Sequence, residues 1–126
     1  MKANGGCYCG AVRYEVDGDT IFKGQCHCRE CQYYSGGQPN MVFGVPAAAF
    51  KVTAGKPATY TRSDIETPVT RSFCATCGTS LWSESPNLPG AFLLKAGTLD
   101  NPADFGMAQM AIYMCDAQPF HAKPEG

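Results

Sequence analysis

Apolar and polar residues alternate in several short stretches of this chain, whereas no long segment repeats its apolar residues with the period of a helix. In AVRYEV, residues 11–16, the side chains of Val12, Tyr14 and Val16 share one side of an extended strand. The apolar or β-branched runs MVFGV, FKVT, ATYTR, AFLLKAGTL and AQMAIYM are predicted to be strands as well. The pattern therefore predicts a mainly β fold with little helix.

Glycine and proline separate these runs, as in GGQP, AGKP and SPNLPG. One short helix is predicted after Pro46, in PAAAF, because proline suits the first turn of a helix. The chain shows no internal repeat and no linker. Residues 1–120 are therefore predicted to form a single domain, and residues 121–126 a frayed C-terminal tail.

Composition and charge narrow the class of protein. The chain has 126 residues, 44% of them hydrophobic and 17% charged, as expected for a globular domain. Its net charge is −1 and its basic residues form no run or stripe, so no nucleic acid or anionic membrane is expected as a partner. The N-terminus does not resemble a signal peptide and no segment is apolar enough to span a membrane, which predicts a cytoplasmic protein.

The eight cysteines indicate either disulfide bonds or metal binding. An even number would suit a secreted disulfide framework, but disulfides rarely persist in the cytosol. Most of these cysteines also stand in close pairs and triplets, and a crosslink between near neighbours constrains the unfolded chain very little. Metal ligation is the better interpretation.

Cys7, Cys9, Cys74 and Cys77 are predicted to bind a structural zinc ion. Cys7 and Cys9 form a C-x-C motif at the predicted start of the first strand, where residues i and i+2 face the same side. Cys74 and Cys77 form a C-x-x-C motif followed by a glycine, the spacing of a zinc knuckle. A redox dithiol is the alternative for this pair, but such dithiols normally open a helix in a βαβ unit.

Cys26, Cys28 and Cys31 form a second group, in CHCREC. Cys26 and Cys28 are predicted to end a strand on one face, and Cys31 to return through a turn. Three protein ligands with one position left open is the usual arrangement of catalytic zinc. A vestigial site is one alternative; an iron–sulfur cluster is another, and Cys115 would then have to supply its fourth thiol.

Four segments together resemble the glutathione-dependent formaldehyde-activating enzyme (GFA) domain, which is also found in centromere protein V. They are GGCYCGAVRYEV, CHCRECQ, FKVTAGKPATY and RSFCATCGTSLW. The resemblance implies a β-tent fold of mostly antiparallel strands around zinc. It assigns Cys7, Cys9, Cys74 and Cys77 to a structural zinc and the Cys26–Cys31 triplet to a catalytic one. It also implies glutathione, a small-molecule thiol, as the partner; no oligomeric state follows from the sequence.

An open zinc site held by three thiolates suits thiol chemistry better than hydroxide generation, since the ligands leave the centre with a net charge of −1. A substrate thiol that loses its proton there becomes a nucleophile near neutral pH. Its attack on a small aldehyde gives an S-hydroxymethyl adduct, and the reverse reaction is a carbon–sulfur lyase step. The alternative function is a non-catalytic, zinc-stabilised binding module.

The residues around the triplet have simpler interpretations. His27 at position i+1 is expected to point away from the ligands, on the surface or in support of them. Arg29 and Glu30 are expected at a solvated tip, with contact to a substrate carboxylate as the alternative. Tyr33 and Tyr34 are expected to be partly buried, with proton donation as the alternative.

Five residues elsewhere are also candidates. Arg62 and Arg71 are predicted to lie in strands near the knuckle and to form surface ion pairs; binding of an acidic, peptide-like substrate is the alternative. Cys115 is expected to be a small buried residue and Trp82 part of the core. His121 falls in the predicted tail and receives no role.

Overall fold

A computed structural model of the protein describes residues 1–122. The described part folds into ten strands, one α-helix and four single-turn 3₁₀ helices. The strands are β1 (Lys2–Gly6), β2 (Arg13–Asp17), β3 (Phe22–Cys26), β4 (Asn40–Pro46), β5 (Phe50–Ala54), β6 (Ala58–Thr61), β7 (Thr70–Phe73), β8 (Ser80–Glu84), β9 (Ala91–Lys95) and β10 (Met110–Ile112). The helices are α1 (Arg29–Tyr34), η1 (Ala47–Ala49), η2 (Ala96–Thr98), η3 (Pro102–Phe105) and η4 (Met114–Asp116).

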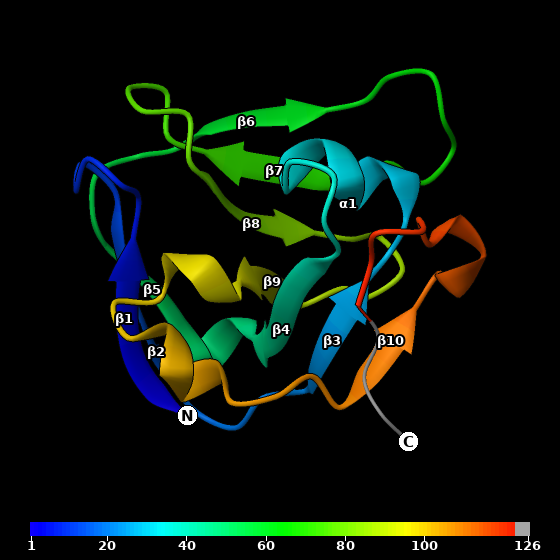
Figure 1. Cartoon of the computed structure of the whole chain (residues 1–126). Helices are drawn as coiled ribbons and strands as arrows, with labels where there is room; N and C mark the ends of the chain where they lie inside the picture. Colours follow the sequence, from blue (N-terminus) through cyan, green and yellow to red (C-terminus); the bar gives the residue numbers. More distant parts are fainter. Residues whose placement is uncertain (123–126) are drawn as a thin grey trace.

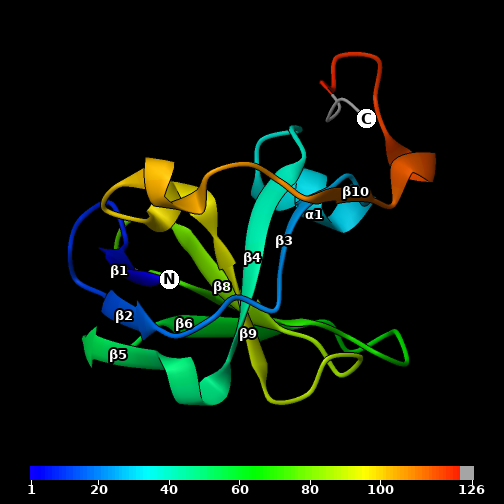
Figure 2. The same ribbon diagram turned by 90° about the horizontal axis from the view of Figure 1, so that it is seen from below.

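These strands form two sheets (Figures 1 and 2). The small sheet has the order β1-β2-β5 and the large one the order β10-β3-β4-β9-β8-β7-β6. The prediction of a mainly β fold with little helix is confirmed. Neighbouring strands run antiparallel except at one edge, where β10 runs parallel to β3 and places the chain after residue 112 beside α1.

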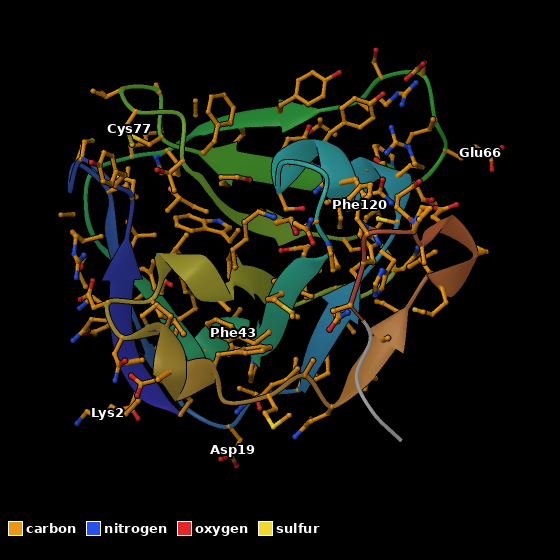
Figure 3. The ribbon with its side chains drawn as sticks, in the orientation of Figure 1. Lys2, Asp19, Phe43, Glu66, Cys77 and Phe120 are labelled. Atoms are coloured by element: carbon orange, nitrogen blue, oxygen red, sulfur yellow. The ribbon has the colours of Figure 1, made fainter. Side chains whose placement is uncertain are left out.

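The main core lies between the two sheets. Tyr14 and Val16 from the small sheet meet Phe43, Leu81 and Leu94 from the large one, and all five are buried. Figure 3 shows Phe43 in the interior, whereas Lys2 and Asp19 point outward at the rim. A separate small cluster, on the large sheet below α1, contains two of the triplet cysteines.

The predicted alternation is confirmed in the first stretch, since Val12, Tyr14 and Val16 are all buried. The helix predicted in PAAAF is a single 3₁₀ turn, Ala47–Ala49, because β5 begins at the next residue. Strand β1 was not predicted, because KANGG has little strand propensity. Its Gly5 lies opposite Tyr14, and a Cβ there would clash with the Thr98 carbonyl oxygen.

The predicted tail falls mostly outside the described residues, which end at 122. His121, the first residue of that segment, is 7% exposed and packs beside His27. No helix among residues 1–122 is long and apolar enough to cross a membrane.

A buried hydrogen bond joins Tyr14 of the small sheet to η2, the turn that follows β9 of the large sheet. The Thr98 hydroxyl donates to the carbonyl of Lys95 at 2.8 Å, so the Tyr14 hydroxyl donates to Thr98 Oγ1, also at 2.8 Å. Burial raises the pKa of Tyr14 to about 12. Because the fold favours the neutral phenol, this contribution to stability is complete below the unfolded pKa of about 10 and is lost as pH rises toward 12.

The variant Tyr14→Phe tests this bond. We expect it to lower the free energy of unfolding at pH 7 by about 1 kcal/mol, the typical net value of one hydrogen bond. Between pH 10 and 12 the wild type should lose more stability than the variant, so the difference should shrink. Urea unfolding followed by circular dichroism across this range measures both effects. An equal pH dependence of the two proteins would contradict the assignment.

Candidate metal centres

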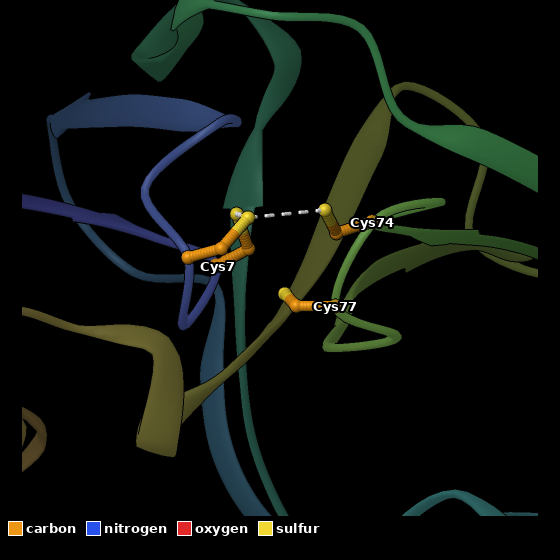
Figure 4. A group of neighbouring side chains, drawn as sticks. Cys7, Cys74 and Cys77 are labelled. Atoms are coloured by element: carbon orange, nitrogen blue, oxygen red, sulfur yellow. Dashed lines mark hydrogen bonds between the residues drawn. The ribbon is translucent and has the colours of Figure 1, made fainter.

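Two turns bring Cys7, Cys9, Cys74 and Cys77 together (Figure 4). The four sulfur atoms all lie within 4.8 Å of one another. Cys7 Sγ and Cys9 Sγ are 3.6 Å apart, and Cys9 Sγ lies 3.7 Å from Cys74 Sγ. A zinc ion with bonds of about 2.3 Å holds tetrahedral sulfurs about 3.8 Å apart. The group therefore fits a four-sulfur metal site.

Each turn presents its pair of sulfurs in a different way. Cys7 and Cys9 lie in the turn between β1 and β2, closed by a hydrogen bond from Gly10 N to Cys7 O at 3.1 Å, so their predicted position in a strand is wrong. Cys74 and Cys77 lie in the predicted knuckle between β7 and β8. There Gly78, with φ of +78°, donates its N–H to the Cys74 carbonyl at 2.8 Å.

Thr79 links the two turns. Its hydroxyl accepts a hydrogen bond from the Tyr8 N–H at 3.1 Å and lies 3.1 Å from Cys77 Sγ, to which it donates. Hydrogen bonds from the hydroxyl and the backbone of Thr79 hold the pKa of Cys77 at about 5. A metal ligand must be a thiolate, so this environment favours the ligating form.

The second group, Cys26, Cys28 and Cys31, joins a strand to a helix. Cys26 is the last residue of β3, Cys28 caps the N-terminus of α1, and Cys31 lies within α1. The predicted return through a turn is therefore a helix, capped by Cys28 Sγ, which accepts the Cys31 N–H at 3.3 Å. The three sulfurs lie within 4.8 Å of one another, and no fourth His, Cys, Asp or Glu among residues 1–122 completes the group.

The surroundings of the triplet favour a thiolate at Cys31. Hydrogen bonds from Cys26 and Cys28, with the positive charges of Lys95 and Arg71, hold the pKa of Cys31 at about 3. The Asn40 side-chain amide also lies 3.8 Å from Cys31 Sγ and points its Nδ2 at it. Three sulfurs held in this way fit a metal site that leaves one coordination position to another ligand.

A cavity of about 210 Å³ opens directly beside these three cysteines. Apolar side chains, among them Phe22, Val42, Leu93 and Ile112, form much of its wall. Tyr113 also lines it and has a left-handed backbone with φ of +55°, which is uncommon for a residue other than glycine. Strained backbone of this kind tends to cluster at functional sites.

A larger surface hollow of about 870 Å³ adjoins this cavity, since Glu30, Val69 and Arg71 line both. Arg71 is buried, lies 3.7 Å from the Glu30 carboxylate, and places its guanidinium 4.2 Å from the centre of the Tyr34 ring. The hollow continues past Tyr60 and two further arginines, Arg29 and Arg62. Aromatic faces and guanidinium groups thus lie along one path to the cysteines.

His27 is fully buried, which excludes the surface position and agrees with the other prediction, a residue that supports the ligands without joining them. His121 accepts the Gln118 N–H at Nδ1 and donates from Nε2 to the Gly37 carbonyl. Its Nδ1 therefore also accepts from His27 Nδ1, 2.8 Å away, and His27 Nε2 accepts from Gln25. This chain of hydrogen bonds fastens the C-terminal segment to the strand that ends in Cys26.

The remaining candidate residues agree only in part with their predicted positions. Trp82 is a core residue, as predicted, and packs against Tyr14 and Phe50. Arg62 follows β6 and forms the expected surface ion pair, with Asp64 at 2.6 Å. Cys115 is exposed, not buried, and Tyr33 is 78% exposed because α1 turns it toward solvent.

Three features of the site were not predicted: the buried Nζ of Lys95, the strained Tyr113 and the His27–His121 pair. Lys95 could have been noticed as a charge inside the apolar run AFLLKAGTL. Nothing local marks Tyr113 or His121, because their positions depend on the parallel pairing of β10 with β3.

Comparison with known proteins gives a consistent result. The sequence profile of the family described as "Glutathione-dependent formaldehyde-activating enzyme" (GFA) matches residues 2–116. A putative glutathione-dependent formaldehyde-activating enzyme of Halomonas elongata is 28% identical over 106 residues, which cover 80% of this chain and 68% of that protein. A crystal structure of a Rhodobacter sphaeroides protein has the same fold, with a TM-score of 0.64 and 23% identity over 86% of this chain and 98% of that one. The chain therefore belongs to the GFA family.

Proposed function

We propose that the chain is a zinc-dependent carbon–sulfur lyase of the S-(hydroxymethyl)glutathione synthase type, acting at the Cys26–Cys28–Cys31 group. The observation that carries this proposal is the convergence of three sulfurs, with no fourth protein ligand among residues 1–122, at the wall of a cavity. A vestigial site would not be expected to keep a capped helix and a hydrogen-bonded Cys31 around its thiols. Family membership supports the thiol chemistry.

Two zinc ions belong to this proposal, one structural and one catalytic. The four-cysteine group would hold the structural ion and organise the strands as a β-tent, since it links the β1–β2 turn to the β7–β8 knuckle. Metal bound in this way contributes directly to the free energy of folding. A cytoplasmic location suits both sites, because its reducing environment keeps the thiols free to ligate.

The two adjoining hollows suit a peptide-like thiol such as glutathione. The smaller one has room for a thiol and a small aldehyde next to the cysteines, between the apolar side chains of Val42 and Leu93. The larger one offers Arg29 and Arg62 near the surface, where carboxylates of the substrate would bind.

In the reaction, the substrate sulfur adds to the aldehyde carbon, the carbonyl π bond breaks, and the thiol proton ends on the new hydroxyl oxygen. Zinc at the triplet, when bound, supplies the Lewis acidity that lowers the pKa of the substrate thiol. The apolar walls of the cavity limit water around the reacting atoms, and Arg71 adds positive charge beside the developing anion. The reverse reaction cleaves the same carbon–sulfur bond.

Serine variants separate the two metal groups. Cys74→Ser removes one of four ligands, and the metal-binding energy that depends on the complete set, about 10–16 kcal/mol in zinc-finger peptides, is as large as the usual stability of a domain, about 5–15 kcal/mol. We expect that variant to unfold or aggregate. Cys28→Ser should stay folded and lose about one zinc ion per chain, because serine is also a good N-cap for α1.

Metal analysis measures the zinc content of both variants, and thermal unfolding measures their stability. Cys115→Ser is the matched control, since this exposed thiol lies outside both groups. If the Cys28 variant unfolds or aggregates as the Cys74 variant does, both groups are structural. This result would favour the alternative function, a non-catalytic binding module.

Activity tests the proposed reaction. We expect zinc-loaded protein to accelerate formation of S-(hydroxymethyl)glutathione from glutathione and formaldehyde, and Cys28→Ser to reduce that rate at least about a hundredfold through loss of the metal. Exchange spectroscopy by NMR follows the adduct at equilibrium. If the wild type gives no acceleration with glutathione or other small thiols, the proposed activity is wrong.

A further inference from the structure

Lys95 carries a buried side-chain nitrogen with no hydrogen-bond partner, and it is the only such side-chain atom within residues 1–122. An unpartnered ammonium in the interior is costly, since it has lost its water and gained no acceptor. A neutral residue of the same length would fill the same space at β9 without this cost. The position therefore calls for an acceptor or a negative charge nearby.

Strand pairing shows where Lys95 points. Lys95 lies opposite Val42 on β4, and Cys26 lies opposite Asn40 on the same strand. Val42 and Asn40 are two residues apart, so all four side chains occupy one face of the large sheet. Leu93, two residues before Lys95, also faces this way and packs on the cluster that contains Cys26. Lys95 therefore projects from the face of the large sheet that lies next to the triplet.

Arg71 reaches the same face from the other direction. It lies opposite Ser83 on β8, and Ser83 lies opposite Leu93 on β9. The triplet therefore has two cations on its sheet side: Lys95, whose Nζ is buried, and Arg71 at the cavity wall. Glu30 is the acidic group in contact with Arg71, and it is half exposed to solvent.

The charges that act on Lys95 match this placement. Burial lowers the pKa of Lys95 and Arg71 adds to this effect, whereas the thiols of Cys31, Cys26 and Cys28 act in the opposite direction and favour the charged amine. Three thiolates around a divalent ion carry a net charge of −1, and an anionic fourth ligand would raise this to −2. Such a charge in a partly apolar cavity requires compensation, and Lys95 is placed to supply it.

We infer that Lys95 is a positioning residue whose enclosed positive charge stabilises the three-cysteine metal site and selects an anionic fourth ligand, such as a thiolate. Lys95 does not line the cavity, so it acts through the thiolates and not by touching the ligand. This inference rests on the proposed open metal site but not on glutathione or on turnover. It predicts that the site prefers anions over neutral ligands of similar size.

The test compares wild type, Lys95→Met, Lys95→Gln and Lys95→Arg, each loaded with cobalt and titrated with thiocyanate, 2-mercaptoethanol and neutral imidazole. The visible absorption of cobalt reports binding without reference to activity. We expect both neutral variants to bind thiocyanate and the thiol more weakly, by on the order of tenfold, while imidazole binding changes little. Lys95→Arg should restore most of the anion affinity. Lys51→Met removes an exposed lysine of β5 and is the matched control.

Each result of these titrations either supports or overturns the proposed role of Lys95. Equal anion affinities for wild type and a folded neutral variant, or equal losses for anions and imidazole, would overturn the role of Lys95. Wild type that binds none of the three ligands would overturn it as well. If anion binding depends on Lys95 but no adduct forms with glutathione and formaldehyde, the inference stands and the proposed activity fails. Lys95→Gln keeps the test valid if the methionine variant does not fold.

Discussion

The meeting of four sulfurs from two distant turns is the constraint on which the rest of the structure depends. Cys9 and Cys74 are 65 positions apart, yet their sulfurs lie 3.7 Å from each other. This contact fixes the small sheet against the knuckle of the large one. The main core, with Tyr14 and Trp82 in edge-to-face contact, fills the space that this arrangement closes. A domain of this size buries a modest core, so a metal ion bound by these four sulfurs would have a large share in its stability.

The large sheet carries a second, more open group of cysteines on the face opposite the main core. Paired positions on β3, β4 and β9 place Cys26, Asn40 and Lys95 on one face, and α1 supplies Cys31 above it. The sheet fixes the positions of the residues on the lower side of the site. The helix and the C-terminal segment, held by the His27–His121 pair, set the upper half.

Most of the fold class and the grouping of the cysteines could be predicted from the sequence. Period-2 alternation is local, as at Tyr14, and ligand spacing is local within each motif. Two errors have different causes. Cys31 lies in a helix because Cys28 caps it, which is a local contact, but cysteine is not among the residues that usually mark an N-cap. His121 is buried because β10 pairs in parallel with β3, and no local pattern encodes that contact.

The central claim is that the two cysteine groups hold metal in the folded protein. The most direct test is metal analysis of the wild-type chain purified under reducing conditions, with intact mass spectrometry of the same sample. We expect two zinc ions per chain and no disulfide. A folded protein without zinc, or one in which disulfides join these cysteines, would contradict it.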